Sequence, residues 1–195
     1  MLQKLKEVFK SLHVDGIARR YFILNGFDGI LTILGISVGA YIAKVSQPSL
    51  IISSSIGTAV GLMVSGVTGA YVTEKAERLG QLKKLKQTMV SDMEGSVQEK
   101  NVKTKSTLIA IINGISPMLC ALISMVPYFL AHLGLIEMVN TAYYASMTVS
   151  GILLILFGSF LGKISKESVF KYAGMMVGAG IITASLSILL GVGTV

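Results

Sequence analysis

The sequence predicts an all-α polytopic membrane protein with five transmembrane helices, and three observations support this fold class. The chain is 52% hydrophobic and 14% charged, with a mean hydropathy of +0.72, and such values exclude an ordinary soluble domain. Long apolar runs alternate with polar connections. Glycine makes up 21 of the 195 residues, as in membrane helices that pack closely through small side chains. We therefore expect a single membrane domain over residues 1–195.

Five apolar segments are long enough to span a membrane, since about 20 residues in a helix cross the roughly 30 Å hydrocarbon core. These segments are residues 21–43, 50–73, 107–133, 143–161 and 169–190. Residues 74–106 form the one long polar segment, which we expect to be a helical insert, because a stripe of apolar residues continues past the second span. The stripe consists of Leu79, Leu82, Leu85 and Met89. It is typical of a seam between helices, and a binding surface is the alternative.

Residues 1–20 precede the first span and place apolar and charged side chains on opposite faces of a helix. We expect an amphipathic helix that lies in the membrane interface. The segment is too charged to be the apolar core of a signal peptide. Without a targeting segment, the expected location is a prokaryotic cell membrane, or a vacuolar membrane if the chain is eukaryotic.

Basic residues predict the orientation, because loops rich in Lys and Arg stay in the cytoplasm. The amino-terminal segment and residues 74–106 hold most of them, and the connection between spans four and five holds Lys163 and Lys166. The other two connections hold only Lys44. We therefore expect a cytoplasmic amino terminus, a cytoplasmic insert and a carboxyl terminus on the opposite side. The net charge of +7 is then a topology signal that favours anionic lipid and requires no nucleic acid.

Asp28 is the most informative residue, because it is the one charged side chain within residues 21–43. An ionised Asp at the centre of a span costs about 2.5 to 3.5 kcal/mol on insertion scales, so such residues usually face protein, water or a cation. Asp28 is therefore a candidate ligand for a cation. The alternatives are a position near the wet interface and a cap at the start of the helix. Asn25 lies one helical turn earlier and is a candidate to hold Asp28 or its ligand.

Catalysis is not expected. Ser37 lies in a Gly-x-Ser-x-Gly sequence, but that motif requires a strand-to-helix turn and here lies inside one apolar helix. The two histidines, His13 and His132, lie away from the membrane centre, so Ser37 has no evident base. The single cysteine, Cys120, excludes a disulfide within the chain.

Four Gly-x-x-x-Gly pairs lie within the spans and predict packing faces rather than chemistry. They begin at Gly35, Gly57, Gly158 and Gly174. One of them is a candidate for a seam between two copies of the chain. Asn113 and Ser116 in the third span are expected to form hydrogen bonds between helices.

Acidic residues in the insert form a second candidate metal site. Asp92, Glu94 and Glu99 lie close to Met89 and Met93, and carboxylates with thioethers suit a divalent transition metal. Ordinary solvated carboxylates are the alternative.

Two segments carry a resemblance to a known family. In the first span, residues 25–29 read Asn-Gly-Phe-Asp-Gly, and in the second, residues 65–77 read Ser-Gly-Val-Thr-Gly-Ala-Tyr-Val-Thr-Glu-Lys-Ala-Glu. Together with five spans and an insert after the second, they resemble the vacuolar iron transporter family of Fe²⁺ and Mn²⁺ transporters. The likeness implies a homodimer whose path is lined by the first two spans of both subunits. It implies export of the metal from the cytosol in exchange for protons, with Asp28 as a ligand and no cofactor besides the transported ion.

The second span departs from the family pattern at two positions, since Gly66 stands where the family has Met and Ala70 stands where it has Glu. Met63, three residues before Gly66, is a candidate replacement ligand, and a gap-filling core residue is the alternative. Ser65 and Thr68 are candidates to line the path with hydroxyl groups. Glu74 and Glu77 close the motif and complete the candidate metal ligands. The insert is shorter and richer in lysine than the family's metal-binding module.

A non-transporting membrane scaffold is the alternative function. In that case the insert recruits a partner protein and Asp28 only fixes the packing of helices. Loss of metal flux on replacement of Asp28, with assembly intact, separates the two hypotheses.

Overall fold

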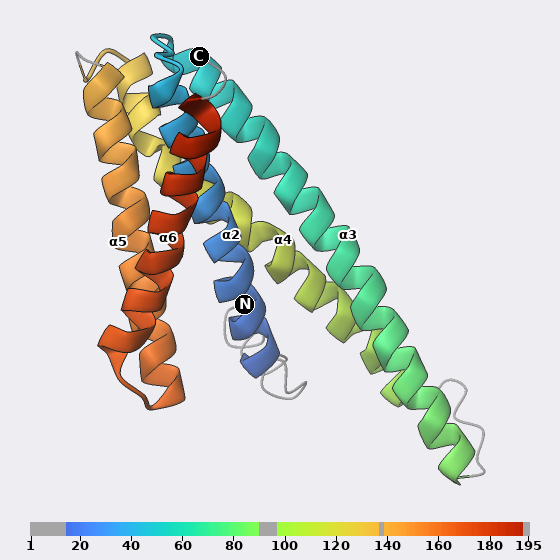
Figure 1. The fold of residues 1–195 in the computed structure, drawn as a ribbon. Coiled ribbons are helices and arrows are strands. Elements are labelled where there is room, and N and C mark those ends of the chain that lie inside the picture. The colour runs from blue at the N-terminus through green and yellow to red at the C-terminus, as the bar shows by residue number, and fades with distance from the viewer. Residues whose placement is uncertain (1–14, 90–96, 137–138, 193–195) are drawn as a thin grey trace. The chain divides into compact units, whose positions relative to one another are not determined.

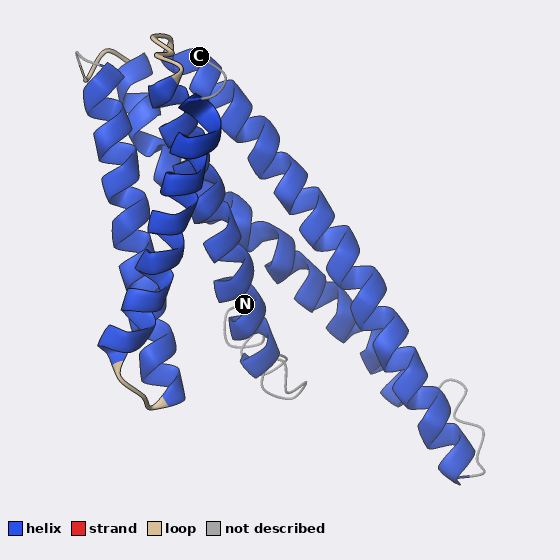
Figure 2. Cartoon of the chain, viewed as in Figure 1, coloured by secondary structure: helices blue, strands red, loops and turns tan. Residues whose placement is uncertain are grey.

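The computed structural model describes residues 15–89, 97–136 and 139–192, and every regular element in those ranges is a helix (Figures 1 and 2). The helices are α2 (Asp15–Ile42), α3 (Pro48–Met89), α4 (Val97–His132), α5 (Val139–Ser165) and α6 (Val169–Val192). All five are long and apolar enough to cross a membrane, which confirms the predicted all-α class and the number of spans. Most of the predicted interfacial helix, residues 1–20, lies outside the described residues.

The described part of the predicted insert consists of extensions of two membrane helices. Helix α3 has 42 residues, about twice the number needed to cross a bilayer, and runs without a break to Met89. Helix α4 begins at Val97, ahead of the predicted third span. Residues 90–96 lie outside the described residues. The apolar stripe therefore continues a helix, as its spacing predicts.

Helices α2, α4 and α5 are followed by residues with left-handed backbone conformation. These residues are Lys44, Gly134 and Lys166, with φ of 51°, 76° and 55°. After α2, the backbone N–H of Val45 donates to Ala40 O at 3.1 Å, and after α4, the N–H of Leu135 donates to Leu130 O at 2.9 Å. Such bonds satisfy carbonyl groups that a helix end leaves open.

The chain divides into two compact units, which are described separately. The first unit comprises residues 1–25 and 62–116, and the second comprises residues 26–61 and 117–195. Helices α5 and α6 belong wholly to the second unit.

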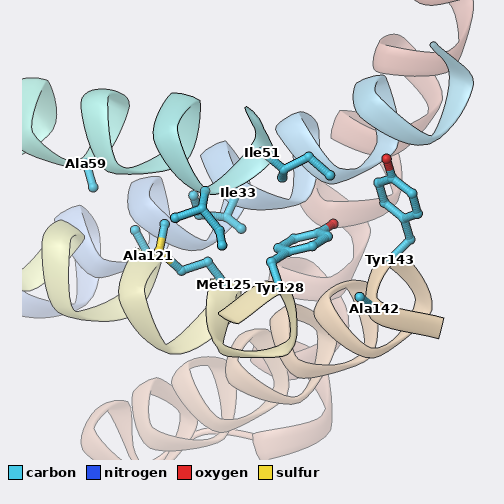
Figure 3. Packing of buried hydrophobic residues seen from close by; sticks show 9 residues of the cluster. Ile33, Ile51, Ala59, Ala121, Met125, Tyr128, Ala142 and Tyr143 are labelled. Carbon is cyan, nitrogen blue, oxygen red and sulfur yellow. The ribbon is translucent and has the colours of Figure 1, made fainter. Parts of the chain in front are cut away.

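The core of the second unit is a cluster of buried residues from α2, α3, α4 and α5 (Figure 3). Its members are Ile33, Ile51, Ile52, Ala59, Ala121, Met125, Tyr128, Ala142 and Tyr143. The rings of Tyr128 and Tyr143 meet edge to face, with centroids 5.7 Å apart, a favoured geometry for aromatic pairs. Bulky aromatic side chains thus alternate with alanines, which lets the helices interlock.

Buried hydroxyl groups also hold the second unit together. Ser146 Oγ in α5 donates to Ser124 O in α4 at 2.7 Å and lies 3.2 Å from Ser37 Oγ in α2. In lipid, such hydrogen bonds add to packing because apolar surface alone gives helices little reason to associate.

Helices α5 and α6 pack side by side through glycine (Figure 1). A Cβ atom on Gly158 would lie 2.5 Å from Ala173 Cα, and one on Gly162 would lie 2.7 Å from Val169 Cα. This pair is therefore a packing face, as its spacing predicts. At Gly57, Gly61, Gly174 and Gly178, by contrast, a Cβ would meet nothing within 4 Å.

The first unit relies on close contact between α3 and α4. A Cβ on Gly114 would lie 2.6 Å from Met63 O, and one on Gly66 would lie 3.1 Å from Asn113 O. Helices α2 and α4 of the first unit are joined by a small cluster of buried residues, Ala18 and Ile109. Gly66 thus lets α3 approach the backbone of α4.

Candidate functional site

Asp28 lies well inside the membrane-spanning part of α2, which runs from Ala18 to Ile42. Ten residues of helix separate it from Ala18, which corresponds to about 15 Å along the axis. Helix α2 begins at Asp15, so Asp28 does not cap the start of the helix.

The Asp28 side chain is exposed on the surface of the chain. Its carboxylate has no hydrogen bond or ion pair with any residue that the structure describes, and only its backbone oxygen accepts a bond, from Thr32 Oγ1 at 2.7 Å. Helix α2 therefore presents an acid that has no side-chain partner among the described residues.

Asn25 belongs to a polar network in the first unit. Its Nδ2 donates to Tyr21 O at 3.0 Å and to Asn113 Oδ1. Asn113 Nδ2 in turn donates to Gly66 O at 2.8 Å, so the two amides link α2, α4 and α3. The expected role of Asn113 between helices is confirmed. Ser116 is also confirmed in that role, because its Oγ donates to Phe22 O.

Glu74 is the buried carboxylate of the first unit, with 7% of its surface exposed. Tyr21 OH in α2 donates to Oε1 at 3.1 Å. Arg78 donates to Oε2 through Nε at 3.1 Å and through Nη2 at 3.0 Å. Both carboxylate oxygens thus have partners within the chain.

The other predicted ligands of α3 lie apart from this pair. Glu77 is exposed and accepts a bond from Gln81 Nε2 at 3.3 Å. Met63 is half-buried. Ser65 and Thr68 are exposed, and their hydroxyls donate to Leu62 O at 3.2 Å and Val64 O at 2.7 Å.

The acidic site predicted in the insert is not described. Asp92 and Glu94 lie outside the described residues, and the side chain of Glu99 in α4 is likewise not described. Within residues 15–89, 97–136 and 139–192, His, Cys, Asp and Glu form no group of three that could hold a metal ion.

Sequence reasoning missed Tyr21 and Arg78 as partners of Glu74. The Arg78 partnership has a signal, because a Glu four residues before an Arg places both on one helix face. Tyr21 has none, since 53 residues separate it from Glu74 and only the packing of α2 against α3 brings them together.

A pocket of about 660 Å³ opens at the end of α2 in the second unit. It is lined by Tyr41, Ile42, Lys44, Val45, Ser46, Asn140 and Tyr143. No predicted site residue lines it.

Comparison with known proteins decides the family. The family model of the VIT family matches residues 76–192, which is more than half of the chain. The chain belongs to the VIT family. It is also 28% identical over 188 residues to an uncharacterized protein of Methanocaldococcus jannaschii, MJ0645, covering 94% of this chain and 93% of that one.

VIT family membership and five helices that are long and apolar enough to span a membrane indicate a multi-pass membrane protein of a metal-ion transporter family. The matched residues begin at Ala76, so Asp28 and Met63 lie ahead of them. The similarity to the archaeal relative extends over nearly the whole chain, and includes most of the first two spans.

Proposed function

We propose that this VIT family protein exports divalent transition-metal ions, Fe²⁺, Mn²⁺ or both, from the cytosol in exchange for protons, and that it does so as a homodimer. The observation that carries this proposal is the unpaired, outward-facing carboxylate of Asp28 inside an apolar span. Facing lipid, the ionised group would cost at least about 2.5 kcal/mol. A proton, a metal ion or a second subunit removes that cost.

The chemistry of a carboxylate suits exchange. A carboxylate oxygen that holds a proton is a poor metal ligand, so metal binding releases the proton and protonation releases the metal. Asp28 would therefore carry one cation or the other, which is the requirement for antiport. Met63, Ser65 and Thr68 would add neutral ligands along α3, with the thioether favouring the softer ions.

The outward face of α3 supports a homodimer. In the second unit it exposes Ser54, Gly57, Thr58 and Gly61, and in the first unit Ser65, Thr68, Gly69 and Thr73. Small and hydroxyl-bearing residues let membrane helices approach closely, and Gly57, Gly61 and Gly69 have open space in front of them. A second α3 is the occupant we propose.

The remaining expectations complete the proposal. We propose that the amino terminus and residues 74–106 lie in the cytoplasm, because loops rich in Lys and Arg stay there. Glu77, Asp92, Glu94 and Glu99 would then collect metal on that side. A prokaryotic cell membrane is the proposed location.

Proteoliposomes with an imposed pH gradient test the function. Uptake of Mn²⁺ and of Fe²⁺ is measured for the native chain, for Asp28→Asn, which keeps the shape and removes the charge, and for Glu167→Gln. Glu167 is an exposed acid between α5 and α6 and serves as the matched control. We expect Asp28→Asn to lose at least about tenfold in flux, since it removes the group that binds the ion. Glu167→Gln should transport normally.

Three outcomes separate the hypotheses. Full flux in Asp28→Asn would show that the ion path does not depend on this carboxylate. Flux that ignores the pH gradient would contradict antiport. No flux of either metal from a folded native dimer would favour a scaffold that recruits a partner through residues 74–106.

A further inference from the structure

We propose that the pocket at the end of α2 binds the phosphate headgroup of an anionic phospholipid, with Lys44 as its charged partner. The pocket has a volume of about 660 Å³, which lies within the range of sites for small ligands. All seven residues that line it belong to the second unit. Lipid binding at this pocket does not depend on the proposed transport of metal ions.

The pocket lies where membrane-spanning segments begin and end. Tyr41 and Ile42 are the last residues of one span, and Asn140 is the first residue of another. Figure 1 shows the α2–α3 and α4–α5 connections at one end of the second unit, opposite the α5–α6 connection. At the end of a span, hydrocarbon gives way to lipid headgroups, and tyrosine is enriched at this level. A phospholipid headgroup is therefore the ligand nearest to hand.

Lys44 gives the pocket its charge. It is exposed, and its ammonium group forms no ion pair or hydrogen bond with any residue that the structure describes. It is the one Lys or Arg in the connecting residues 43–47 and 133–138, and none of the seven lining residues is acidic. The one acid of these connections, Glu137, lies outside the described residues. The described lining therefore suits an anion.

Neutral hydrogen-bond donors line the pocket beside Lys44. The side chains of Ser46 and Asn140 have no hydrogen-bond partner among the described residues, so their O–H and N–H groups are free to donate. Tyr41 OH and Tyr144 OH lie 3.0 Å apart and share one hydrogen bond, so one of their two protons is not used between them. Phosphate oxygens accept hydrogen bonds, and a charged acceptor strengthens each of them.

Tyr143 holds the pocket in shape. Its hydroxyl donates to Val45 O at 2.5 Å, next to Lys44 in the chain. Its ring meets the Tyr41 ring edge to face, with centroids 5.7 Å apart. The backbone beside Lys44 and the Tyr41 ring are thus fixed before a ligand arrives, which lowers the entropy cost of binding.

Two helices begin at the same end of the second unit and add positive potential. Helix α3 begins at Pro48, two residues after Ser46, and helix α5 begins at Val139, one residue before Asn140. Neither helix has an acidic residue in its first turn. The start of a helix carries partial positive charge that favours an anion, and no acid in these turns offsets it.

An apolar face of α5 favours a lipid over a free phosphate ion. Tyr144, Thr148, Ile152 and Ile155 follow one another at steps of three or four residues, so they share one face of the helix. All four are exposed. The face begins at Tyr144, whose hydroxyl contacts Tyr41 of the pocket. A phospholipid with its phosphate in the pocket would lay an acyl chain along this face, whereas a free phosphate would gain nothing from it.

Titration of the detergent-solubilised chain with dioleoyl-phosphatidylglycerol, followed by native mass spectrometry, tests the lipid site. The variants are Lys44→Gln and, as matched control, Lys166→Gln. Both lysines are exposed and have left-handed backbone conformation, with φ of 51° and 55°, but Lys166 lies at the opposite end of the second unit (Figure 1). We expect Lys44→Gln to weaken binding of the first lipid roughly 5-fold, the usual effect of one basic residue at an anionic membrane surface. Lys166→Gln should bind as the native chain does.

Thermal unfolding gives a second measurement. Phosphatidylglycerol should raise the unfolding temperature of the native chain by mass action, and it should raise that of Lys44→Gln less. Dioleoyl-phosphatidylcholine should not distinguish the two, because its quaternary ammonium lies beside the phosphate and repels Lys44. Lys44→Arg keeps the charge and should bind close to the native affinity. Ser46→Ala removes one donor and should weaken binding about 2- to 10-fold.

Three outcomes would overturn the lipid site. Unchanged phosphatidylglycerol binding in Lys44→Gln would show that the pocket does not hold the headgroup. An equal loss in Lys166→Gln would mean that lipid follows the surface charge of the whole chain. Inorganic phosphate that binds as tightly as the lipid would assign the pocket to a soluble anion. Metal flux is not measured in these experiments, so the lipid site and the transport function stand or fall separately.

Discussion

Gly29 in α2 lies directly against the backbone of Pro117 in α4, so that a Cβ atom at position 29 would come within 2.8 Å of Pro117 Cα. Both sides of this contact are main chain, and neither can move aside as a side chain would. Only glycine fits, and the residue next to it in α2 is Asp28. The contact therefore sets the position of the segment that carries the candidate ligand.

Gly29→Ala should lower the free energy of unfolding by about 1–3 kcal/mol, as overpacking usually does. Gly39→Ala, on the same helix but with nothing within 4 Å of the added atom, should have little effect. Thermal unfolding followed by circular dichroism in detergent compares the two. Equal stability of both variants would mean that α2 and α4 are farther apart in solution.

Cysteine cross-linking tests the proposed dimer face of α3. Ser54 is exposed and its neighbour Ser55 is fully buried, so the pair provides a test residue and a matched control on adjacent positions. The native chain has one cysteine, Cys120, which is buried, so it can be kept. Ser54→Cys in membranes should form a disulfide-linked dimer with oxidant, and Ser55→Cys should not. Cross-linking of neither variant would move the interface away from this part of α3.

Tyr143→Phe should destabilise the second unit. The hydroxyl of Tyr143 donates to Val45 O at 2.5 Å and also lies 3.3 Å from Ala40 O. Its removal leaves the part-buried Val45 O without this donor, whereas Ala40 O keeps the backbone N–H of Val45. We expect a loss of about 1–3 kcal/mol. Tyr144→Phe loses only an exposed bond to Tyr41 OH, at 3.0 Å, and should change stability by less than about 0.5 kcal/mol. Urea or thermal unfolding ranks the two.

Asn25 and Asn113 should behave as one unit. Each Asn→Ala variant leaves the other amide short of a partner, so each should cost about 1–3 kcal/mol. The double variant should cost less than the sum, because the second change removes an interaction that is already lost. Additive losses in thermal unfolding would show that the two amides act independently.

The acidic residues of the insert provide a test of metal binding outside the membrane helices. Asp92→Asn, Glu94→Gln and Glu99→Gln in one chain should reduce the number of Mn²⁺ ions bound per subunit, if carboxylates in the insert hold metal as proposed. Isothermal titration calorimetry counts the sites. A matched variant, Lys100→Gln with Lys103→Gln, removes nearby charge of the opposite sign and should not reduce the count.

The number of spanning helices among the described residues could be predicted from the sequence because lipid imposes a simple length requirement. Their ends were harder to predict. Helix α3 runs from Pro48 to Met89, well past the predicted span end at Thr73, because the backbone of a helix does not need to stop where the membrane does. Charged residues indicate the edge of the bilayer. They do not indicate where the helix ends, because its backbone hydrogen bonds can continue into water.

Whether an individual contact could be predicted depended on how common its chemistry is inside membrane helices. The bonds of Asn113 could be expected, since a buried amide in a span almost always finds a partner. The bond from Tyr21 to Glu74 could not, because it depends on the rotation of α2 and α3 about their axes. Metal binding by the remaining candidate residues stays a prediction.

The hydrogen-bonded group around Ser146, which consists of the Ser37 and Ser146 hydroxyls and the Ser124 carbonyl, bears on how the protein is made. Ser37 in α2 and Ser124 in α4 are synthesised before Ser146 in α5. The hydrogen bonds that both residues form with Ser146 can therefore form only after α5 has been made. Membrane helices first insert singly and then associate, so the register of α2 and α4 is completed late, by a residue synthesised after both. A chain truncated before α5 should therefore insert normally yet remain unassembled, and become a substrate for membrane quality control.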